Sequence, residues 1–250
     1  MRDPSVVERV WFGAGTAASL SRALLTPVER LFGAIVGARE LMYDAGWLAS
    51  RDTSIPALSV GNLTVGGTGK TPIAAWLARG LADRGARPAV VLRGYGQDEP
   101  LVHRALNPDI PVVLGRDRRD AIERAARDGA DIAVLDDAFQ HRQVRRFADL
   151  VLVNADRWTP RVRLLPAGPW RERLEAIRRA TLIIVTRKTA TDSLVERVHT
   201  ALAQVAATVP RVSVRLEQMD LRRAEVDASD ERLPIDAVAG ASIRAVLSIA

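Results

Sequence analysis

The sequence has no cysteine, only three histidines, and only two lysines among its 36 basic residues. The lack of cysteine excludes disulfides and thiolate metal sites, and the spacing of the histidines is not that of a zinc site. We expect structural roles for His103 and His199. No uncharged apolar run reaches the roughly 18 residues that a membrane-spanning helix needs. Because Asp3 and Glu8 interrupt the first residues, we expect no cleavable signal peptide.

The composition that remains is sufficient for a globular core. Hydrophobic residues make up 48% and charged residues 26% of the 250 residues, which suits one large or two small domains. The formal net charge of +6 favours phosphorylated substrates, anionic lipid or nucleic acid as partners. Aromatic residues are not interleaved with the basic ones, so we expect no nucleic-acid partner. No protein partner is inferred.

Short apolar runs alternate with helical segments from residue 55 onward. Strands that are apolar throughout, separated by helices, predict an α/β fold with a mostly parallel sheet covered on both faces. The predicted strands are 55–60, 89–92, 112–114, 132–135, 150–153, 182–185 and 212–216, and the predicted helices are 71–84, 118–128, 172–180 and 193–207. Residues 217–240 are expected to form a connection or a small irregular element, and 244–250 a strand that opens a further unit.

Residues 1–50 are expected to form a separate helical segment, ahead of a core at 51–216 and a connection at 217–250. Apolar residues recur there at helical spacing, namely Leu20, Leu24, Val28, Leu31, Phe32, Ile35 and Val36, with Trp11, Phe12, Tyr43 and Trp47 flanking them. Arginines lie between the apolar positions. This pattern fits a helix lying in a membrane interface, and it fits equally a helix packed against its own domain.

One of the two lysines, Lys70, ends a glycine-rich segment that directly follows a predicted strand. A point-like ammonium beside glycines and a hydroxyl suits a nucleotide polyphosphate with Mg²⁺. Glycines let backbone N–H groups turn toward phosphate oxygens, and the following helix N-terminus adds its positive end. The strict P-loop pattern fails at its first position, where Thr64 replaces glycine. We predict a P-loop NTPase-like site in which ATP is bound by Gly66, Gly67, Thr68, Gly69, Lys70 and Thr71, with the Thr71 hydroxyl on Mg²⁺.

Two pairs of carboxylates follow predicted strands. Asp136 and Asp137 end an apolar strand, the position at which P-loop folds hold Mg²⁺ or its water shell. Asp98 and Glu99 could accept a proton from an attacking hydroxyl or join the metal shell, although such a pair alone is more often a charged surface loop. His141 is expected to orient the acidic loop that precedes it.

Arginine is the remaining candidate for contacts to phosphate. Arg116 and Arg118 precede a predicted helix and could neutralise a transferring phosphoryl group, although most arginines of this chain must be surface charges. Arg171 and Glu172 end the rigid Pro/Gly-bracketed loop 165–172. Loops of this kind often carry binding groups on a fixed scaffold.

Together these segments resemble the tetraacyldisaccharide 4′-kinase family, the lipid A biosynthesis kinases of Gram-negative bacteria. The resemblance runs from about residue 15 to the C-terminus. It is carried by SVGNLTVGGTGKTP at 59–72, RGYG at 93–96, DEP at 98–100, DDAFQH at 136–141 and LPAGPWRE at 165–172. The first and fourth segments are the most specific, since generic P-loop enzymes lack them.

The resemblance implies a kinase that uses ATP and Mg²⁺ to phosphorylate the 4′-hydroxyl of a lipid-linked glucosamine disaccharide 1-phosphate. The implied catalytic residues are Asp98, Lys70 and Arg118; the implied metal residues are Thr71, Glu99, Asp136 and Asp137; the implied substrate-binding residues are Asn62, Arg171 and Glu172. It also implies that the N-terminal helix docks on the anionic inner membrane. The protein is then expected to be peripheral, at the cytoplasmic face.

The chain departs from the family pattern at four places. Ala138 stands where glycine is usual, and Leu92 stands where serine is usual. A single residue separates Gly96 from Asp98, where the family has a longer, hairpin-bearing segment. The family also continues past the segment resembling 244–250 into an Asp-His-His region, one histidine of which works with the catalytic carboxylate. We therefore expect a fragment, a truncated gene product or a member with impaired chemistry.

Two alternatives stay open at this point. One is a P-loop ATPase or GTPase that acts as a switch, which would need a base-recognition motif that residues 186–188 match poorly. The other is a degenerate, non-catalytic family member that binds nucleotide or lipid. The short link before Asp98 and the missing histidine region favour this second alternative.

Overall fold

The computed structural model describes residues 5–94, 98–217, 220–222 and 232–234. The helices are α1 (Val6–Phe12), α2 (Thr16–Asp44), α3 (Lys70–Ala82), α4 (Asp98–Leu106), α5 (Arg118–Arg127) and α6 (Asp192–Val205), with the 3₁₀ turns η1 (Ala155–Arg157) and η2 (Leu174–Arg179). The strands are β1 (Ala57–Asn62), β2 (Pro88–Leu92), β3 (Val112–Leu114), β4 (Ile132–Asp136), β5 (Ala148–Asn154), β6 (Leu182–Arg187), β7 (Arg211–Arg215), β8 (Asp220–Arg222) and β9 (Arg232–Pro234).

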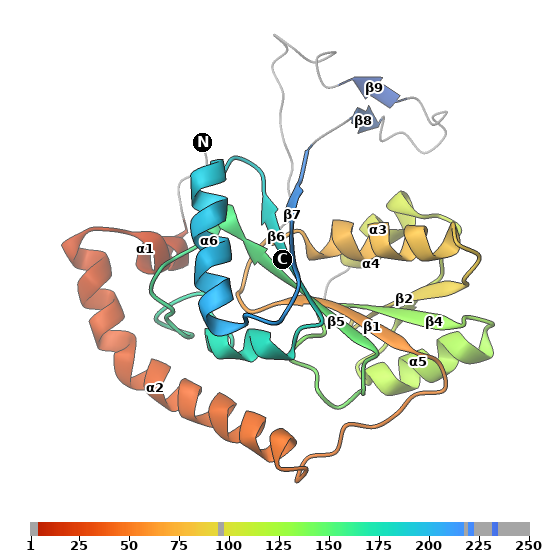
Figure 1. The fold of residues 1–250 in the computed structure, drawn as a ribbon, viewed down its shortest axis with the longest axis horizontal. Coiled ribbons are helices and arrows are strands. Elements are labelled where there is room, and N and C mark those ends of the chain that lie inside the picture. The colour runs from red at the N-terminus through yellow and green to blue at the C-terminus, as the bar shows by residue number, and fades with distance from the viewer. Residues whose placement is uncertain (1–4, 95–97, 218–219, 223–231, 235–250) are drawn as a thin grey trace.

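Seven strands form one parallel sheet in the order β3-β2-β4-β1-β5-β6-β7 (Figure 1). β1 lies between β4 and β5, so the chain reverses its direction of winding at β1. In open parallel sheets the carboxyl ends of the strands beside such a reversal form a crevice where ligands bind. The predicted parallel α/β fold is confirmed.

Consecutive side chains of each strand point to opposite sides of the sheet, and the central strands β1, β2 and β4 are buried on both sides because helices cover both faces. In β5, Leu152 packs with the α3 side chains Ile73 and Ala74, whereas Val151 and Val153 pack with α6 on the other face. α5 covers that same second face at the β2–β4 end. The layers are therefore helix, sheet and helix, as the uninterrupted apolar runs predict.

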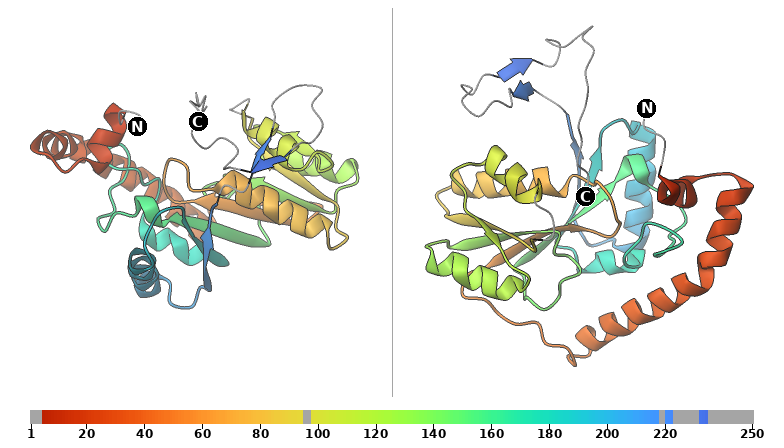
Figure 2. Two further views of the ribbon diagram at one scale, coloured as in Figure 1. Left: turned by 90° about the horizontal axis from the view of Figure 1, so that it is seen from above. Right: turned by 180° about the vertical axis from the view of Figure 1, so that it is seen from behind.

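The N-terminal segment forms two helices rather than one. Ser5 and Glu8 form a capping box that starts α1, and α2 then runs for 29 residues with Pro27 inside it. α2 lies along the outside of the molecule on the α6 side, and it contacts the core through Phe32 and the buried Gly33 (Figures 1 and 2).

The predicted apolar stripe of α2 is mostly exposed to solvent. Leu20, Leu24, Leu31 and Ile35 have exposed fractions of 65%, 73%, 63% and 60%. Phe32 is the member of the stripe that packs against the core, so packing against its own domain, one of the two interpretations of this pattern, accounts for only a small part of the stripe. Within the residues that the structure describes, none of the helices has the length and apolarity to cross a bilayer.

Three other sequence-based expectations differ from the structure. The expected loop at Asp98 is the start of α4, and the expected helix at 172–180 is the shorter 3₁₀ turn η2. Within 217–240, β8 and β9 form an antiparallel pair. The strand expected at 244–250 lies outside the described residues, and the division at residues 50 and 216 stays a prediction.

Candidate functional site

The glycine-rich segment connects β1 to the N-terminus of α3. Lys70 is the first residue of α3, and Gly69 before it has a φ of 87°, which residues with a side chain rarely adopt. A Cβ atom at Gly69 would also lie 2.5 Å from Leu216 Cδ1. No side chain caps the first turn of α3. The N–H groups and the positive end of the helix are thus left for a phosphate.

Side chains near the carboxyl ends of three strands hold this loop in place through hydrogen bonds. Asn62 at the end of β1 donates from Nδ2 to Thr68 Oγ1 at 3.0 Å. Thr186 in β6 donates to the Thr68 carbonyl at 2.9 Å, and Asn154 in β5 donates to the Gly67 carbonyl at 3.0 Å. Asn62 is fully buried. Asn62 thus holds the phosphate loop in the structure, and its predicted substrate contact stays a prediction.

Two acids at the carboxyl end of β4, the last strand residue Asp136 and the following Asp137, lie beside this loop. β1 and β4 are neighbours with Val60 opposite Asp136, so the lysine and the acids meet at the same sheet edge. Asp137 Oδ1 lies 3.7 Å from Lys70 Nζ. Arg171 Nη1 donates to both oxygens of Asp137 at 3.0 Å. The sequence-predicted residues Lys70, Asp136, Asp137 and Arg171 are thus brought together.

Asp136 is held by a histidine to which the sequence interpretation gave only a structural role. His103 Nε2 lies 3.0 Å from Asp136 Oδ2, and the exposed fractions of the two side chains are 1% and 2%. The other oxygen, Asp136 Oδ1, is buried and has no hydrogen-bond partner. An oriented carboxylate with one free oxygen suits a Mg²⁺ ion or a water bound to it.

The acidic pair at the start of α4 separates into two environments. Glu99 faces the pocket, and burial together with the nearby Asp136 and Asp137 raises its pKa. Asp98 is exposed and does not line the pocket. Its predicted role as the catalytic carboxylate stays a prediction. Glu99, one helical turn before His103, is the member of the pair that the structure brings to the predicted metal site.

Arg118 is buried beside the same acids, with an exposed fraction of only 3%. Its Nη2 donates to the carbonyl oxygens of Asp136 and Asp137 at 3.1 and 2.9 Å. Burial lowers the pKa of this guanidinium; the negative charge of Asp137 partly offsets that effect, and the positive charge of Arg93 adds to it. Arg118 thus fixes the backbone that carries the acids while its charge faces the pocket.

Glu172 lies away from this cluster. It is buried, and Arg179 Nη2 donates to it at 2.6 Å. Arg179 also pairs with Glu40 of α2 at 3.0 Å and lies over the Phe139 ring at 4.6 Å. Burial raises the pKa of Glu172, partly offset by the charge of Arg179. Glu172 thus belongs to a buried ion-pair group that also contacts α2, and its predicted substrate contact stays a prediction.

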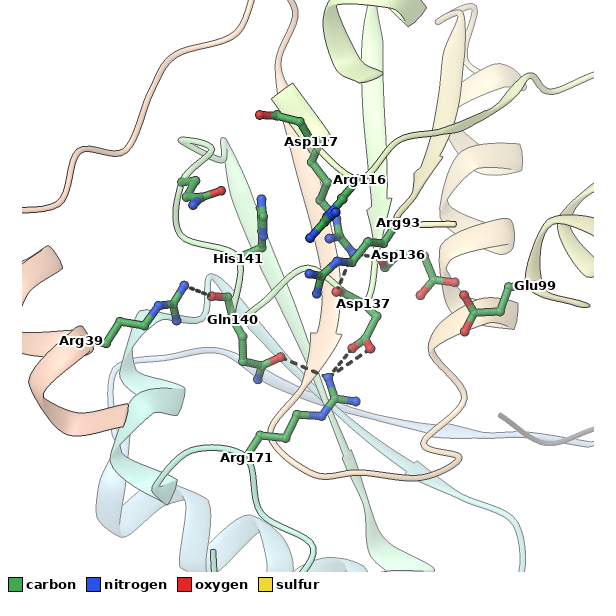
Figure 3. A pocket seen from close by; sticks show the side chains of 12 residues that line it. Arg39, Arg93, Glu99, Arg116, Asp117, Asp136, Asp137, Gln140, His141 and Arg171 are labelled. Atoms are coloured by element: carbon green, nitrogen blue, oxygen red, sulfur yellow. Dashed lines mark hydrogen bonds and ion pairs between the residues drawn. The ribbon is translucent and has the colours of Figure 1, made fainter. Parts of the chain in front are cut away.

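The acids open into a pocket of about 850 Å³ (Figure 3). Its walls come from α2, α4, the β2, β3 and β4 ends and the 171 loop. The lining residues are Arg39, Arg93, Glu99, Arg116, Asp117, Arg118, Asp136, Asp137, Gln140, His141, Gln143 and Arg171. His141 lines the pocket but has no described side-chain bond to the acids. Burial, and then Arg118, Arg93 and Arg146, lower its pKa to about 4.

The sequence interpretation missed three residues of this site. His103 could have been found from its spacing, since a residue four positions after Glu99 lies on the same face of a helix. Arg39 and Gln140 carry no comparable signal. Arg39 Nη2 donates to the Gln140 carbonyl at 3.0 Å, and Gln140 Oε1 accepts from Arg171 at 3.3 Å. These contacts join α2 to the acidic cluster through Arg171.

A parallel sheet with this loop and these carboxylates at its edge defines the class of P-loop proteins that act on nucleoside polyphosphates. A family model described as "Tetraacyldisaccharide-1-P 4′-kinase" matches residues 21–246. The chain belongs to this family of kinases, and the predicted family is confirmed.

Individual relatives agree with this result. The tetraacyldisaccharide 4′-kinase of Anaeromyxobacter sp. strain Fw109-5 is 37% identical over 274 residues, covering 98% of this chain and 72% of the relative. That of Halorhodospira halophila is 41% identical over 167 residues, covering 59% of this chain and 51% of the relative. The crystal structure of LpxK from Aquifex aeolicus in complex with ATP superposes with a TM-score of 0.69 at 29% identity, over 87% of this chain and 70% of that one.

Proposed function

We propose that this chain transfers the γ-phosphoryl group of ATP to the 4′-hydroxyl of a tetraacyl disaccharide 1-phosphate. Family membership supports the acceptor, and the ATP named for the Aquifex aeolicus structure supports the donor. The observation that carries the proposal is the 3.7 Å approach of Lys70 Nζ to Asp137 Oδ1 above the glycine-rich loop. It brings a phosphate-binding cation and a metal-binding anion to one place.

Phosphoryl transfer requires mainly positioning and charge neutralisation. The α3 N-terminus and the Lys70 ammonium bind the β- and γ-phosphates in this proposal. The Thr71 hydroxyl, Asp137 and the free Oδ1 of Asp136 are the groups that would hold Mg²⁺ or its water shell. Mg²⁺, when bound, neutralises negative charge on the phosphates. Arg118 adds a further buried positive charge beside the acids.

The acceptor hydroxyl needs a base or an orienting carboxylate. We assign this role to Asp98, with Glu99 beside the metal. Asp98 begins α4, the helix that also carries His103, so a shift of α4 would move both acids together. One observation favours a non-catalytic nucleotide-binding protein instead, namely that Asp98 lies outside the pocket in this structure.

The lipid acceptor also explains the exposed apolar side of α2. Leu20, Leu24, Leu31 and Ile35 present a row that water-soluble proteins normally bury, and acyl chains can cover such a row at an interface. We therefore propose that α1 and α2 dock the protein peripherally on an anionic membrane. Because ATP is the phosphoryl donor, the cytoplasmic face of the inner membrane is the side that fits.

A radiolabel transfer assay tests the proposed activity. The chain would be incubated with [γ-³²P]ATP, Mg²⁺ and tetraacyl disaccharide 1-phosphate in neutral detergent micelles. We expect labelled lipid from the parent and from Arg197→Ala, a charge-matched control at an exposed position of α6. We expect at least a hundredfold less from Lys70→Ala, because the ammonium meets the developing charge. Equal transfer by Lys70→Ala would disprove the proposal. Nucleotide binding without transfer by the parent would establish the non-catalytic alternative.

A further inference from the structure

The helix that begins with the acidic pair is attached to the phosphate-binding helix away from the site. α3 and α4 lie side by side (Figure 1), and both begin at the site, α3 with Lys70 and α4 with Asp98. Farther from the site, Asn107, the residue directly after α4, joins the two helices. We call Asn107 and its two partners on α3, Ala75 and Arg79, the helix clasp.

Both halves of the Asn107 amide are used in the helix clasp. Nδ2 donates to the carbonyl oxygen of Ala75 at 2.9 Å, and Oδ1 accepts from Arg79 Nε at 3.2 Å. Ala75 and Arg79 are about one helical turn apart, so the planar amide is held at two points of α3. Asn107 is only 5% exposed. The amide resists displacement, because moving it would leave a buried donor or acceptor without a partner.

The main chain around Asn107 is held as well. Its N–H donates to the His103 carbonyl at 2.9 Å, and its own carbonyl accepts from Ile110 N at 3.2 Å. Ile110 is buried in the same core cluster as the α3 side chain Ile73. A displacement of the helix clasp would therefore disturb the core between α3 and the sheet. The end of α4 that lies away from the acids is thus its fixed end.

A small rotation of α4 about this fixed end would displace the acids appreciably. The nine residues of α4 span about 13 Å at the helical rise of ~1.5 Å per residue. Over that length, a rotation of about 5° moves the start of the helix by about 1 Å. A misplacement of about 1 Å can lower a catalysed rate about 100-fold. The contact of His103 with Asp136 lies between the two ends of α4, so it does not fix the direction of the helix by itself.

The arrangement of the helix clasp exceeds what a local role of Asn107 requires. An asparagine directly after a helix often serves only the helix end, since it tolerates the backbone conformation needed there. Both described bonds of the Asn107 amide go to α3 instead. Arg79 is itself held, because its other two guanidinium nitrogens pair with Asp83 and Asp109. The clasp therefore sets how α4 lies relative to α3.

We propose that Asn107 is a positioning residue for phosphoryl transfer, because it fixes the end about which α4 can turn. It thereby sets where Asp98 and Glu99 lie relative to Lys70. The inference rests on the proposed function, in which these acids act on the acceptor and beside the metal. A shift of α4 that brings Asp98 to the acceptor takes place about the same end. The nucleotide binds to the loop and to the start of α3, so loss of the helix clasp lowers kcat without lowering nucleotide affinity.

Asn107→Leu tests the proposal, because leucine has a similar size and no hydrogen-bonding group. Each variant is first shown by urea unfolding to be folded at the assay temperature. In the radiolabel transfer assay we expect kcat to fall about 10- to 100-fold. We expect the Kd for ADP with Mg²⁺, measured by calorimetry, to change less than about twofold, since the clasp does not contact the loop. Arg79→Met removes one of the two bonds of the amide, so its kcat should fall less than that of Asn107→Leu.

The direction of α4 can also be measured without turnover. The chain has no cysteine, so spin labels can be attached at Leu101→Cys on α4 and Arg197→Cys on α6, both exposed positions. Double electron–electron resonance then gives the distribution of distances between the two labels. We expect Asn107→Leu to broaden or displace this distribution relative to the labelled parent.

Asp83→Asn is the matched control, since it removes an exposed partner of Arg79 and leaves both bonds of the amide. We expect it to change neither kcat nor the distances appreciably. The proposal is wrong if Asn107→Leu keeps the parent's kcat, if it weakens nucleotide binding as much as it lowers kcat, or if Asp83→Asn has the same effect. If the parent transfers no label to lipid, the proposed function fails and the spin-label distances decide on the helix clasp separately. A broadened or displaced distribution in Asn107→Leu supports the clasp, and an unchanged one overturns it.

Discussion

The contact between His103 and Asp136 gives the most specific prediction about the metal site. Replacing His103 by leucine removes the only described donor to the Asp136 carboxylate and leaves an apolar side chain of similar bulk in its place. Both oxygens of a carboxylate that is 2% exposed then lack a partner. A lost hydrogen bond to a buried charged group costs about 1.5–3 kcal/mol. The substitution also removes the unpartnered Nδ1 of His103, so we expect a net loss of about 1–2 kcal/mol in unfolding free energy.

Metal binding is affected in two opposite directions by the same substitution. Loss of the bond lets the Asp136 carboxylate turn away, which lowers metal affinity by about 10- to 100-fold in comparable sites. Loss of the His103 donor also leaves the negative charge of the Asp136 carboxylate more available to the cation, which raises the metal affinity. We expect orientation to dominate and the affinity for Mn²⁺, used in place of Mg²⁺, to fall about tenfold. His103→Gln keeps a donor near the position of Nε2 and should recover most of the loss.

Electron paramagnetic resonance of Mn²⁺ with ADP measures this affinity without turnover, and urea unfolding measures stability. His199→Leu is the control, since His199 bonds only Ser213 near the surface in the described part of the chain. We expect it to change neither quantity appreciably. Unchanged or tighter Mn²⁺ binding by His103→Leu would refute the reasoning. A loss of affinity in His103→Gln as large as that in His103→Leu would also refute it.

Three further predictions concern α2 and the pocket. Arg179→Met leaves Glu172 buried without its cation, and we expect the free energy of unfolding in urea to fall by about 3–5 kcal/mol. NMR titration should give His141 a pKa of about 4. Because the pKa of His141 is lower in the folded than in the unfolded protein, the unfolded protein takes up the proton at higher pH. The free energy of unfolding should therefore fall as the pH drops from 6.5 toward 4, and it should fall less in His141→Gln. Leu24→Glu should reduce binding to anionic vesicles by at least tenfold, whereas Leu101→Glu, at another exposed apolar position, on α4, should not.

The sequence predicts the sheet well because its strands are buried on both faces. A strand that is covered on both faces has apolar residues at consecutive positions, as in 132–135, and such a run is easily recognised in the sequence. The phosphate loop is equally predictable, since Gly69 is required both by its φ and by contact with Leu216. α4 was missed because its apolar residues Leu101, Val102 and Leu106 are exposed, whereas the residues that it buries are Pro100 and His103. Local sequence resembles a charged loop there, and the contact of His103 with Asp136 appears only in the folded chain.

Roles that depend on distant contacts could not be predicted from local sequence. Glu172 follows a rigid loop, which suggested a ligand contact, but its partner Arg179 becomes apparent only in the folded chain. Asn62 precedes the glycines, yet its side chain turns inward to Thr68. Arg39 is one of many arginines, and only its position beside Tyr43 distinguishes it. In each case the residue type was visible and the direction of its side chain was not.

The surroundings of Asp137 also determine the order in which ligands bind. Arg171 and Lys70 both contact this carboxylate, so a metal ion must compete with two cations. In the described residues no group of three or more histidine, aspartate or glutamate side chains could hold a metal ion by itself. Mg²⁺ commonly relies on one or two carboxylates together with phosphate oxygens. The metal should therefore enter with the nucleotide, whose phosphates attract Lys70 away from Asp137.

This order has a measurable consequence. Mn²⁺ titration of the protein alone should give at least tenfold weaker binding than titration in the presence of ADP. Lys70→Met removes one competing cation, so it should tighten Mn²⁺ binding to the protein alone. The same substitution should weaken binding of the nucleotide, because the ammonium is then missing from the phosphates. If Lys70→Met left metal binding by the protein alone unchanged, the contact with Asp137 would not restrict the metal, and the proposed order of binding would lose its physical basis.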